Sequence, residues 1–78
     1  MTLTINYFGM IAEWVGAGQN ELSFAGSTVK ELRSELESKY PKLTGISYQV
    51  AVDQKIATAE QELTESSEIA LLPPFAGG

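Results

Sequence analysis

The fold is decided by residues 28–40, which read TVKELRSELESKY. Thr28 followed three residues later by Glu31 is typical of a capping box, in which each side chain satisfies a free backbone N–H of the first helical turn. The apolar residues recur at helical spacing and form one stripe, made of Val29, Leu32, Leu36 and Tyr40. Pro41 ends the pattern, because the residue before a proline disfavours helical geometry. We predict a helix over residues 28–40 with this stripe in the core.

The segment before the helix favours two strands with a helical turn between them. Residues 2–8 alternate between apolar and polar side chains, which predicts an opening strand. Residues 10–15 carry apolar side chains at helical spacing, and Gly16 follows where a helix commonly ends. We predict a second strand over residues 21–25.

The segment after the helix favours three more strands. Residues 48–53 alternate, and Asp53-Gln54 can form a tight turn into a short partner strand at 55–57. Residues 59–64 are predicted to form a loop or a single helical turn. The last strand, residues 69–72, is apolar at every position, which favours a central strand buried on both faces.

This order of elements predicts an α+β fold with one main helix on a mixed sheet of about four to five strands. The first and last strands would pair at the centre of the sheet, as in a β-grasp (ubiquitin-like) fold. We expect residues 1–74 to form the β-grasp domain and residues 75–78 to form a flexible C-terminal Gly-Gly tail.

Composition excludes several classes of function. A chain of 78 residues has room for one core. Without Cys or His it has no disulfide, no usual metal ligand and no imidazole or thiolate for catalysis, so we expect no metal, no bound cofactor and no independent enzyme activity. The net charge of −5 argues against nucleic-acid binding. The chain lacks a basic leader and any apolar stretch long enough to span a membrane, so we expect a cytoplasmic protein.

The sequence of the C-terminus indicates that this segment takes part in the function. The last predicted strand continues into residues 73–78, PPFAGG, in which the two prolines direct the backbone out of the sheet. Six residues can reach roughly 20 Å at about 3.3 Å each, and terminal glycines can enter a narrow pocket. The alternative is an ordinary mobile chain end. The apolar residues before the glycines favour a segment that is received by another protein.

Residues 67–78, SEIALLPPFAGG, resemble the ending of the small subunits of molybdopterin synthase, a family of ubiquitin-like sulfur carriers. The resemblance extends to residues 5–9 (INYFG), 11–16 (IAEWVG), 28–32 (TVKEL) and 50–54 (VAVDQ). Pro-Pro before Gly-Gly is the specific part, since Gly-Gly alone is shared with ubiquitin and the thiamine-pathway carrier. Relatives often carry a basic residue at the position of Ala12, so one partner contact differs here.

The resemblance implies a sulfur carrier that is not an enzyme on its own. Gly78 would be adenylated by an E1-like adenylating enzyme that uses ATP, and a persulfide sulfur donor would supply the sulfur of a thiocarboxylate. The large subunit of molybdopterin synthase would receive the tail and pass the sulfur to cyclic pyranopterin monophosphate, within a heterotetramer. The alternatives are a carrier for thiamine or another sulfur pathway, a ubiquitin-like modifier, or a non-catalytic interaction module.

The expected roles of individual residues follow from this resemblance. Gly78 is the expected covalent site, and Gly77 and Ala76 are expected to allow passage of the tail. The residues expected to bind the partner are Phe8, Leu72, Pro73, Pro74 and Phe75. Phe8 fits a docking face and a core position equally well, whereas Trp14 and the stripe of the main helix are expected in the core.

Overall fold

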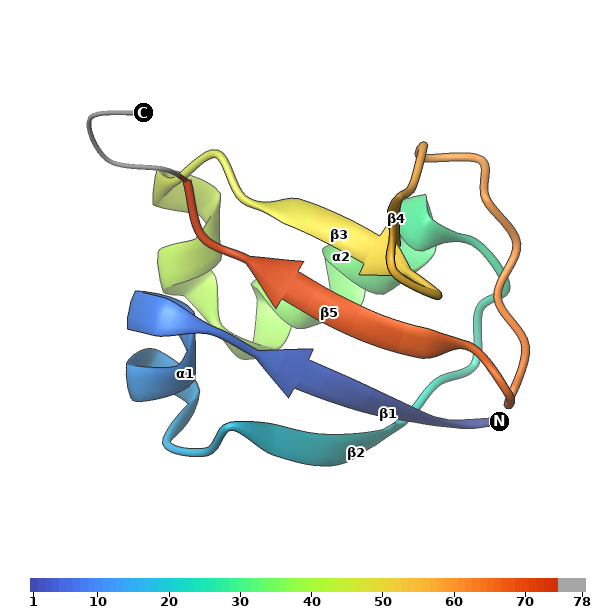
Figure 1. Ribbon diagram of the computed structural model, residues 1–78, viewed down its shortest axis with the longest axis horizontal. Helices are drawn as coiled ribbons and strands as arrows, with labels where there is room; N and C mark the ends of the chain where they lie inside the picture. Colours follow the sequence, from blue (N-terminus) through green and yellow to red (C-terminus); the bar gives the residue numbers. More distant parts are fainter. Residues whose placement is uncertain (75–78) are drawn as a thin grey trace.

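The computed structural model describes residues 1–74, which form a five-stranded mixed sheet with one long helix across one face (Figure 1). The elements in chain order are β1 (Thr2–Tyr7), α1 (Gly9–Val15), β2 (Gln19–Ser23), α2 (Val29–Lys39), the 3₁₀ helix η1 (Pro41–Gly45), β3 (Gln49–Val52), β4 (Lys55–Ile56) and β5 (Glu68–Leu72).

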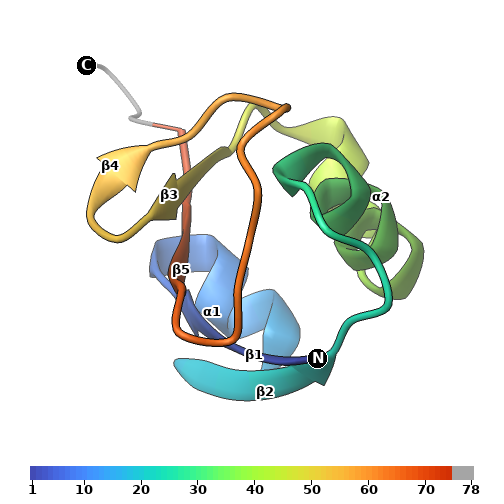
Figure 2. The same cartoon turned by 90° about the vertical axis from the view of Figure 1, so that its right-hand side faces the viewer.

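The strand order confirms the predicted topology. Among the described strands it is β2-β1-β5-β3-β4, with β1 and β5 parallel at the centre and the other pairs antiparallel. Figure 2 shows α2 on one side of the sheet only, so within residues 1–74 no helix covers the opposite side. This arrangement is the β-grasp, or ubiquitin-like, fold.

The start of α2 is fixed by its cap and by a distant loop. Thr28 Oγ1 accepts a hydrogen bond from the Glu31 N–H at 3.4 Å, and Glu31 Oε1 accepts from the Thr28 N–H at 3.1 Å, which completes the predicted capping box. Carbonyl groups in the segment 59–61 accept from the N–H groups of Val29 and Lys30. The free donors of the first turn are therefore satisfied from both sides.

A single apolar core lies between α2 and the sheet. Most members come from alternate strand positions and from the helix stripe, as the periodicities predict. The buried members are Leu3, Ile5, Tyr7, Ile11, Leu22, Phe24, Val29, Leu32, Leu36, Leu43, Tyr48, Val50, Val52, Leu63, Ile69 and Leu71. Leu43 in η1 and Leu63 in the loop before β5 close the two ends of this core, although neither lies in a periodic segment.

Three predictions from the sequence were wrong in detail. The second strand begins at Gln19 rather than at residue 21, because the Tyr7 N–H donates to the carbonyl of Gly18 and pairing with β1 starts at that turn. It also ends before Phe24, whose side chain is nevertheless buried. Tyr40 is the C-cap of α2 and is only half-buried, so the buried part of the stripe ends at Leu36.

The third error concerns β5, which is central but is not buried on both faces. Ile69 and Leu71 point into the core and are fully buried, whereas Ala70 and Leu72 point to the uncovered side and are half-buried. A run of apolar residues shows that a strand is central, but it does not show how many layers cover the sheet. The apolar surface that Ala70 and Leu72 leave exposed on β5 is therefore a candidate binding surface.

Within residues 1–74, none of the helices has the length and apolar character needed to cross a bilayer.

Candidate functional site: the open sheet face and the start of the tail

Strand register gathers apolar side chains on the uncovered face of the sheet. Ala70 pairs with Ala51, and Ala51 pairs with Ile56, so these three side chains form a row across β5, β3 and β4. Leu72 lies two residues beyond Ala70 and therefore points to the same face. Phe8, the residue after β1, has the same parity on the neighbouring strand. We call these five residues, Phe8, Ala51, Ile56, Ala70 and Leu72, the open-face patch.

The patch includes two large side chains with much exposed surface. Phe8 is 48% exposed and Ile56 is 56% exposed, whereas a side chain of either type would be stabilised by burial. Phe8 is thus outside the core. The sequence allowed a position on a docking face or in the core, and the structure excludes the core position. An exposed apolar cluster on a sheet face is typical of a surface that another protein covers.

The other half of the same face is polar. Asn6 lies beside Ala70 in the strand register, and its Nδ2 donates to the Ile69 carbonyl at 3.3 Å. Its Oδ1 accepts a hydrogen bond from Gln19 Nε2 at 2.8 Å. These paired amides form a polar boundary along β1 and β2, so the apolar area is confined to β5, β3, β4 and the end of β1.

The chain leaves the sheet at the same end as Phe8. β1 and β5 run parallel, with Tyr7 beside Leu71, so the residues that follow each strand lie next to one another. Gly9 has a positive φ of +56°, and a Cβ atom built there would lie 3.0 Å from Cγ of Pro73. The close approach of Gly9 and Pro73 therefore positions the start of the C-terminal segment against the start of α1 (Figure 1).

The patch has no chemistry of its own. Its five side chains are hydrocarbon and contain no titratable or nucleophilic group. Among the described residues, Asp and Glu side chains nowhere gather in a group of three that could hold a metal ion. The arrangement offers an apolar surface for binding beside the point where the C-terminal segment begins.

The structure brings together four of the residues predicted from the sequence. Phe8, Leu72, Pro73 and Pro74 lie at one end of the molecule, and the last three are half-buried. Phe75, Ala76, Gly77 and Gly78, which include the predicted covalent site, lie outside the described residues, so their roles stay predictions. Trp14 was predicted to be a core residue, but it is only partly buried and contacts the edge of the core.

Three members of the patch, Ala51, Ile56 and Ala70, are not among the partner contacts expected from the sequence. Ile56 is the most exposed of them. Its position follows from the hairpin, since Asp53 and Gln54 both have positive φ and form a two-residue turn. Such a turn pairs Val52 with Lys55 and Ala51 with Ile56, so the register of the hairpin could have placed Ile56 beside Ala51 of β3.

Comparison with known proteins gives this site a family context. The model of the ThiS family matches residues 5–78. The chain belongs to the ThiS family. A molybdopterin synthase sulfur carrier subunit from Caenorhabditis briggsae is 34% identical over 83 residues, covering 100% of this chain and 99% of the relative. This ThiS-family chain therefore matches that relative from end to end.

Two solved structures support the fold assignment. A putative molybdopterin converting factor subunit 1 from Pyrococcus furiosus has a TM-score of 0.86 at 17% identity, covering 96% of this chain and 99% of its own. In a complex of subunits 1 and 2 of molybdopterin-converting factor from Helicobacter pylori, a chain matches with a TM-score of 0.70 at 23% identity, and both chains are fully covered. At these identities the likeness shows that the ThiS-family chain shares their fold.

Proposed function

We propose that this chain is a sulfur carrier and the small subunit of a molybdopterin synthase. The observation that carries the proposal is the similarity to a molybdopterin synthase sulfur carrier subunit over the whole chain, up to the terminal glycines. The structure is consistent with this role, since it provides an apolar docking face beside the start of the C-terminal segment.

The chemistry that the proposal assigns to Gly78 begins with activation. A carboxylate is a poor acyl donor, so a separate adenylating enzyme transfers AMP from ATP to the Gly78 carboxylate and releases pyrophosphate. The terminal sulfur of a persulfide then attacks the carbonyl carbon and AMP leaves. A second thiol then attacks the donor's inner sulfur and breaks the remaining S–S bond. The donor and this thiol leave as a disulfide, and a thiocarboxylate remains on Gly78.

The acceptor step assigns separate tasks to the two subunits. The large subunit holds cyclic pyranopterin monophosphate and the acid–base groups, and the sulfur of the thiocarboxylate displaces an oxygen from a carbon of the substrate, so a C–S bond forms as a C–O bond breaks. Water then hydrolyses the bond between this sulfur and the acyl carbon of Gly78, which leaves the sulfur on the substrate and restores the carboxylate for another cycle. The β-grasp body contributes binding, which raises the effective concentration of the sulfur at the acceptor.

The open-face patch is the surface by which the carrier would bind its large subunit. Phe8, Leu72 and Pro73 lie where the chain leaves the sheet, so a partner that covers them is also in place to receive the terminal residues. Ile56 extends the same surface away from this end. Burying these side chains provides affinity, and it orients the start of the tail because Leu72, from which the tail continues, is the last residue of β5 and belongs to the patch.

The test of this function is the intact mass of the untagged protein, purified under mild conditions from its native host. We expect a fraction that is heavier by the mass difference between sulfur and oxygen, and we expect that fraction to disappear when Gly78 is deleted. Gly45→Ala is the matched control, because a Cβ at Gly45 meets nothing within 4 Å. A heavier fraction that persists without Gly78, or none in the native protein, would contradict the proposal.

Co-purification separates molybdopterin synthesis from the other pathways. A large synthase subunit should be retained on the untagged carrier in the proposed case. Recovery of the heavier fraction together with enzymes of thiamine synthesis, or of target proteins joined to the C-terminus through an amide, would instead identify another sulfur pathway or a modifier.

A further inference from the structure

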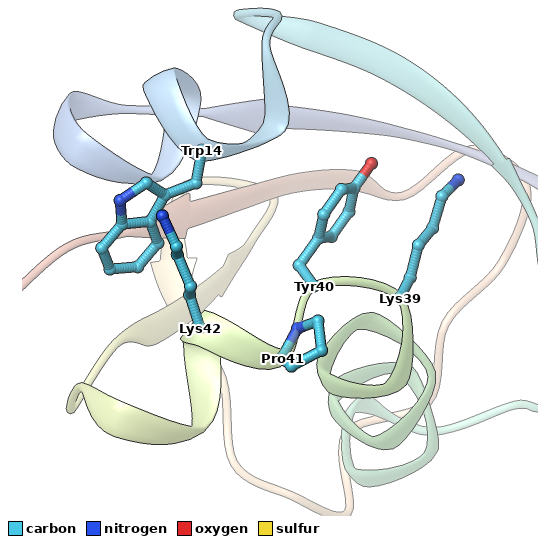
Figure 3. A pocket seen from close by; sticks show the side chains of 5 residues that line it. All are labelled: Trp14, Lys39, Tyr40, Pro41 and Lys42. Carbon is cyan, nitrogen blue, oxygen red and sulfur yellow. The ribbon is translucent and has the colours of Figure 1, made fainter.

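A small pocket lies on the helix side of the molecule, away from the open-face patch. It has a volume of about 210 Å³ and is lined by Trp14, Lys39, Tyr40, Pro41 and Lys42. Figure 3 shows the rings of Trp14 and Tyr40 on opposite sides of the pocket, with Pro41 below them. The three residues come from α1, from the C-cap of α2 and from η1, so the pocket forms where these elements meet.

The rim of the pocket carries two cations. Lys42 Nζ lies 5.6 Å from the centroid of the Trp14 ring, and Lys39 Nζ lies 5.7 Å from the centroid of the Tyr40 ring. Both lysines are exposed. Two of the five basic residues of a chain with a net charge of −5 therefore flank one apolar cleft. Lys39 also offsets the dipole of α2 in its last turn, but Lys42 lies beyond that helix.

The aromatic wall on the Tyr40 side is held in place. The Tyr40 ring packs edge-on against Tyr7, with 6.3 Å between ring centroids and 75° between ring planes. The Tyr40 hydroxyl accepts a hydrogen bond from Asn20 Nδ2 at 3.4 Å. A ring fixed by a buried neighbour loses little freedom when a ligand binds, so the pocket is preorganised on this side.

From this arrangement we propose that the Trp14–Tyr40 pocket binds an acidic peptide segment of a partner protein. One apolar or aromatic side chain of the segment enters between the two rings, and carboxylates on either side of it contact Lys39 and Lys42. The volume favours a single side chain, because sites for small-molecule ligands usually occupy about 300–1,000 Å³. Trp and Tyr are also among the residue types that dominate the energetics of protein interfaces.

The pocket lies near the point where the chain leaves the sheet. In Figure 1, α1 and the end at which α2 gives way to η1 lie at the end of the molecule where β5 leads out of the sheet. An acidic segment on the pocket would therefore engage the same end of the carrier by a second surface. A cationic spot on an otherwise acidic protein would also orient the encounter. The inference does not depend on the sulfur chemistry, because it concerns a different face.

Trp14 allows the proposal to be tested directly. It is the only tryptophan in the chain, so its fluorescence reports on this pocket alone. The full-length protein is titrated with the blocked peptide acetyl-Glu-Glu-Phe-Glu-Glu-amide, with its glutamine counterpart acetyl-Gln-Gln-Phe-Gln-Gln-amide, and with inorganic phosphate. We expect a saturable change in emission with the acidic peptide only, and we expect it to weaken as salt is added.

Two double variants that carry the same net charge as each other separate the pocket cations from the overall charge of the chain. Lys39→Gln with Lys42→Gln removes both cations of the pocket, whereas Lys30→Gln with Lys55→Gln removes two exposed lysines elsewhere. We expect the first pair to weaken binding about tenfold and the second pair to leave it nearly unchanged. Equal effects of the two pairs, equal binding of the glutamine peptide, saturation by phosphate alone, or no response of Trp14 would each overturn the proposal.

Discussion

The Tyr7 hydroxyl donates a hydrogen bond of 2.8 Å to Asn20 Oδ1, and this contact joins β1 to β2 inside the edge of the core. Asn20 in turn donates to Tyr40 at the end of α2. The three side chains connect the sheet to the helix by hydrogen bonds, where most other contacts across the core are apolar. The network thus fixes the end of α2, and with it one wall of the Trp14–Tyr40 pocket.

Removing the Tyr7 hydroxyl tests this network. Tyr7→Phe keeps the ring in the core but leaves Asn20 Oδ1 without its donor, so we expect the free energy of unfolding to fall by about 1 kcal/mol. Urea denaturation followed by circular dichroism at neutral pH measures the change. An unchanged midpoint would mean that water replaces the hydroxyl without loss.

Alkaline pH should destabilise the protein through the same residue. Burial raises the pKa of Tyr7 from 10.0 to about 12, with a further contribution from Tyr40. The folded state favours the neutral phenol of Tyr7. Its contribution to the free energy of unfolding is therefore fully present below pH 10 and is lost as the pH rises towards 12. Urea denaturation above pH 10 should show a smaller loss in Tyr7→Phe than in the native chain. Parallel losses in the two proteins would assign the effect to other groups.

Acid should weaken the cap of α2. The backbone N–H groups of Ser27 and then Thr28 hydrogen-bond to the Glu31 carboxylate and lower its pKa from the usual 4.5. The stabilisation by this carboxylate is therefore present above pH 4.5 and is lost as the pH falls through the lowered value. Glu31→Gln should remove that part of the acid dependence of the unfolding free energy, whereas Glu35→Gln, on the same helix outside the cap, should retain it.

How much of this could be predicted depends on whether a feature is local. The capping box of Thr28 and Glu31 and the turn at Asp53-Gln54 are set by neighbouring residues, and both were predicted from the sequence. The partial exposure of Ala70 was not predicted, because a run of apolar residues in β5 does not show whether a second layer covers the strand. The pocket was missed for the same reason, since Trp14 and Tyr40 meet only when α1 packs near the end of α2.

The C-cap of α1 offers a test of backbone strain. Gly16 has φ of +86° and donates its N–H to the Ala12 carbonyl at 2.9 Å, a conformation that disfavours side chains. A Cβ at Gly16 meets nothing within 4 Å, so Gly16→Ala should cost about 1 kcal/mol through the backbone alone. Gly45→Ala, without a positive φ, should cost little in the same urea series. Equal effects would argue against strain at Gly16.

The open-face patch makes the strongest prediction about binding. Ile56→Asp places a charge where the proposed complex buries hydrocarbon, so we expect the affinity for the large synthase subunit to fall about tenfold or more. Ile56 is 56% exposed in the free chain, and the fold should therefore persist. Isothermal titration of the two purified subunits measures the affinity, and thermal unfolding of the carrier alone checks the fold.

Ala59→Asp is the control for that experiment, because it adds the same charge at an exposed position beside the start of α2. It should leave the affinity within about twofold of the native value, because salt screens a charge that lies outside the interface. If Ile56→Asp and Ala59→Asp bind equally well, the large subunit does not cover β4, and the docking surface is confined to the other members of the open-face patch and the residues after Leu72. Loss of binding in Ile56→Asp alone would place the partner across the whole row from β5 to β4.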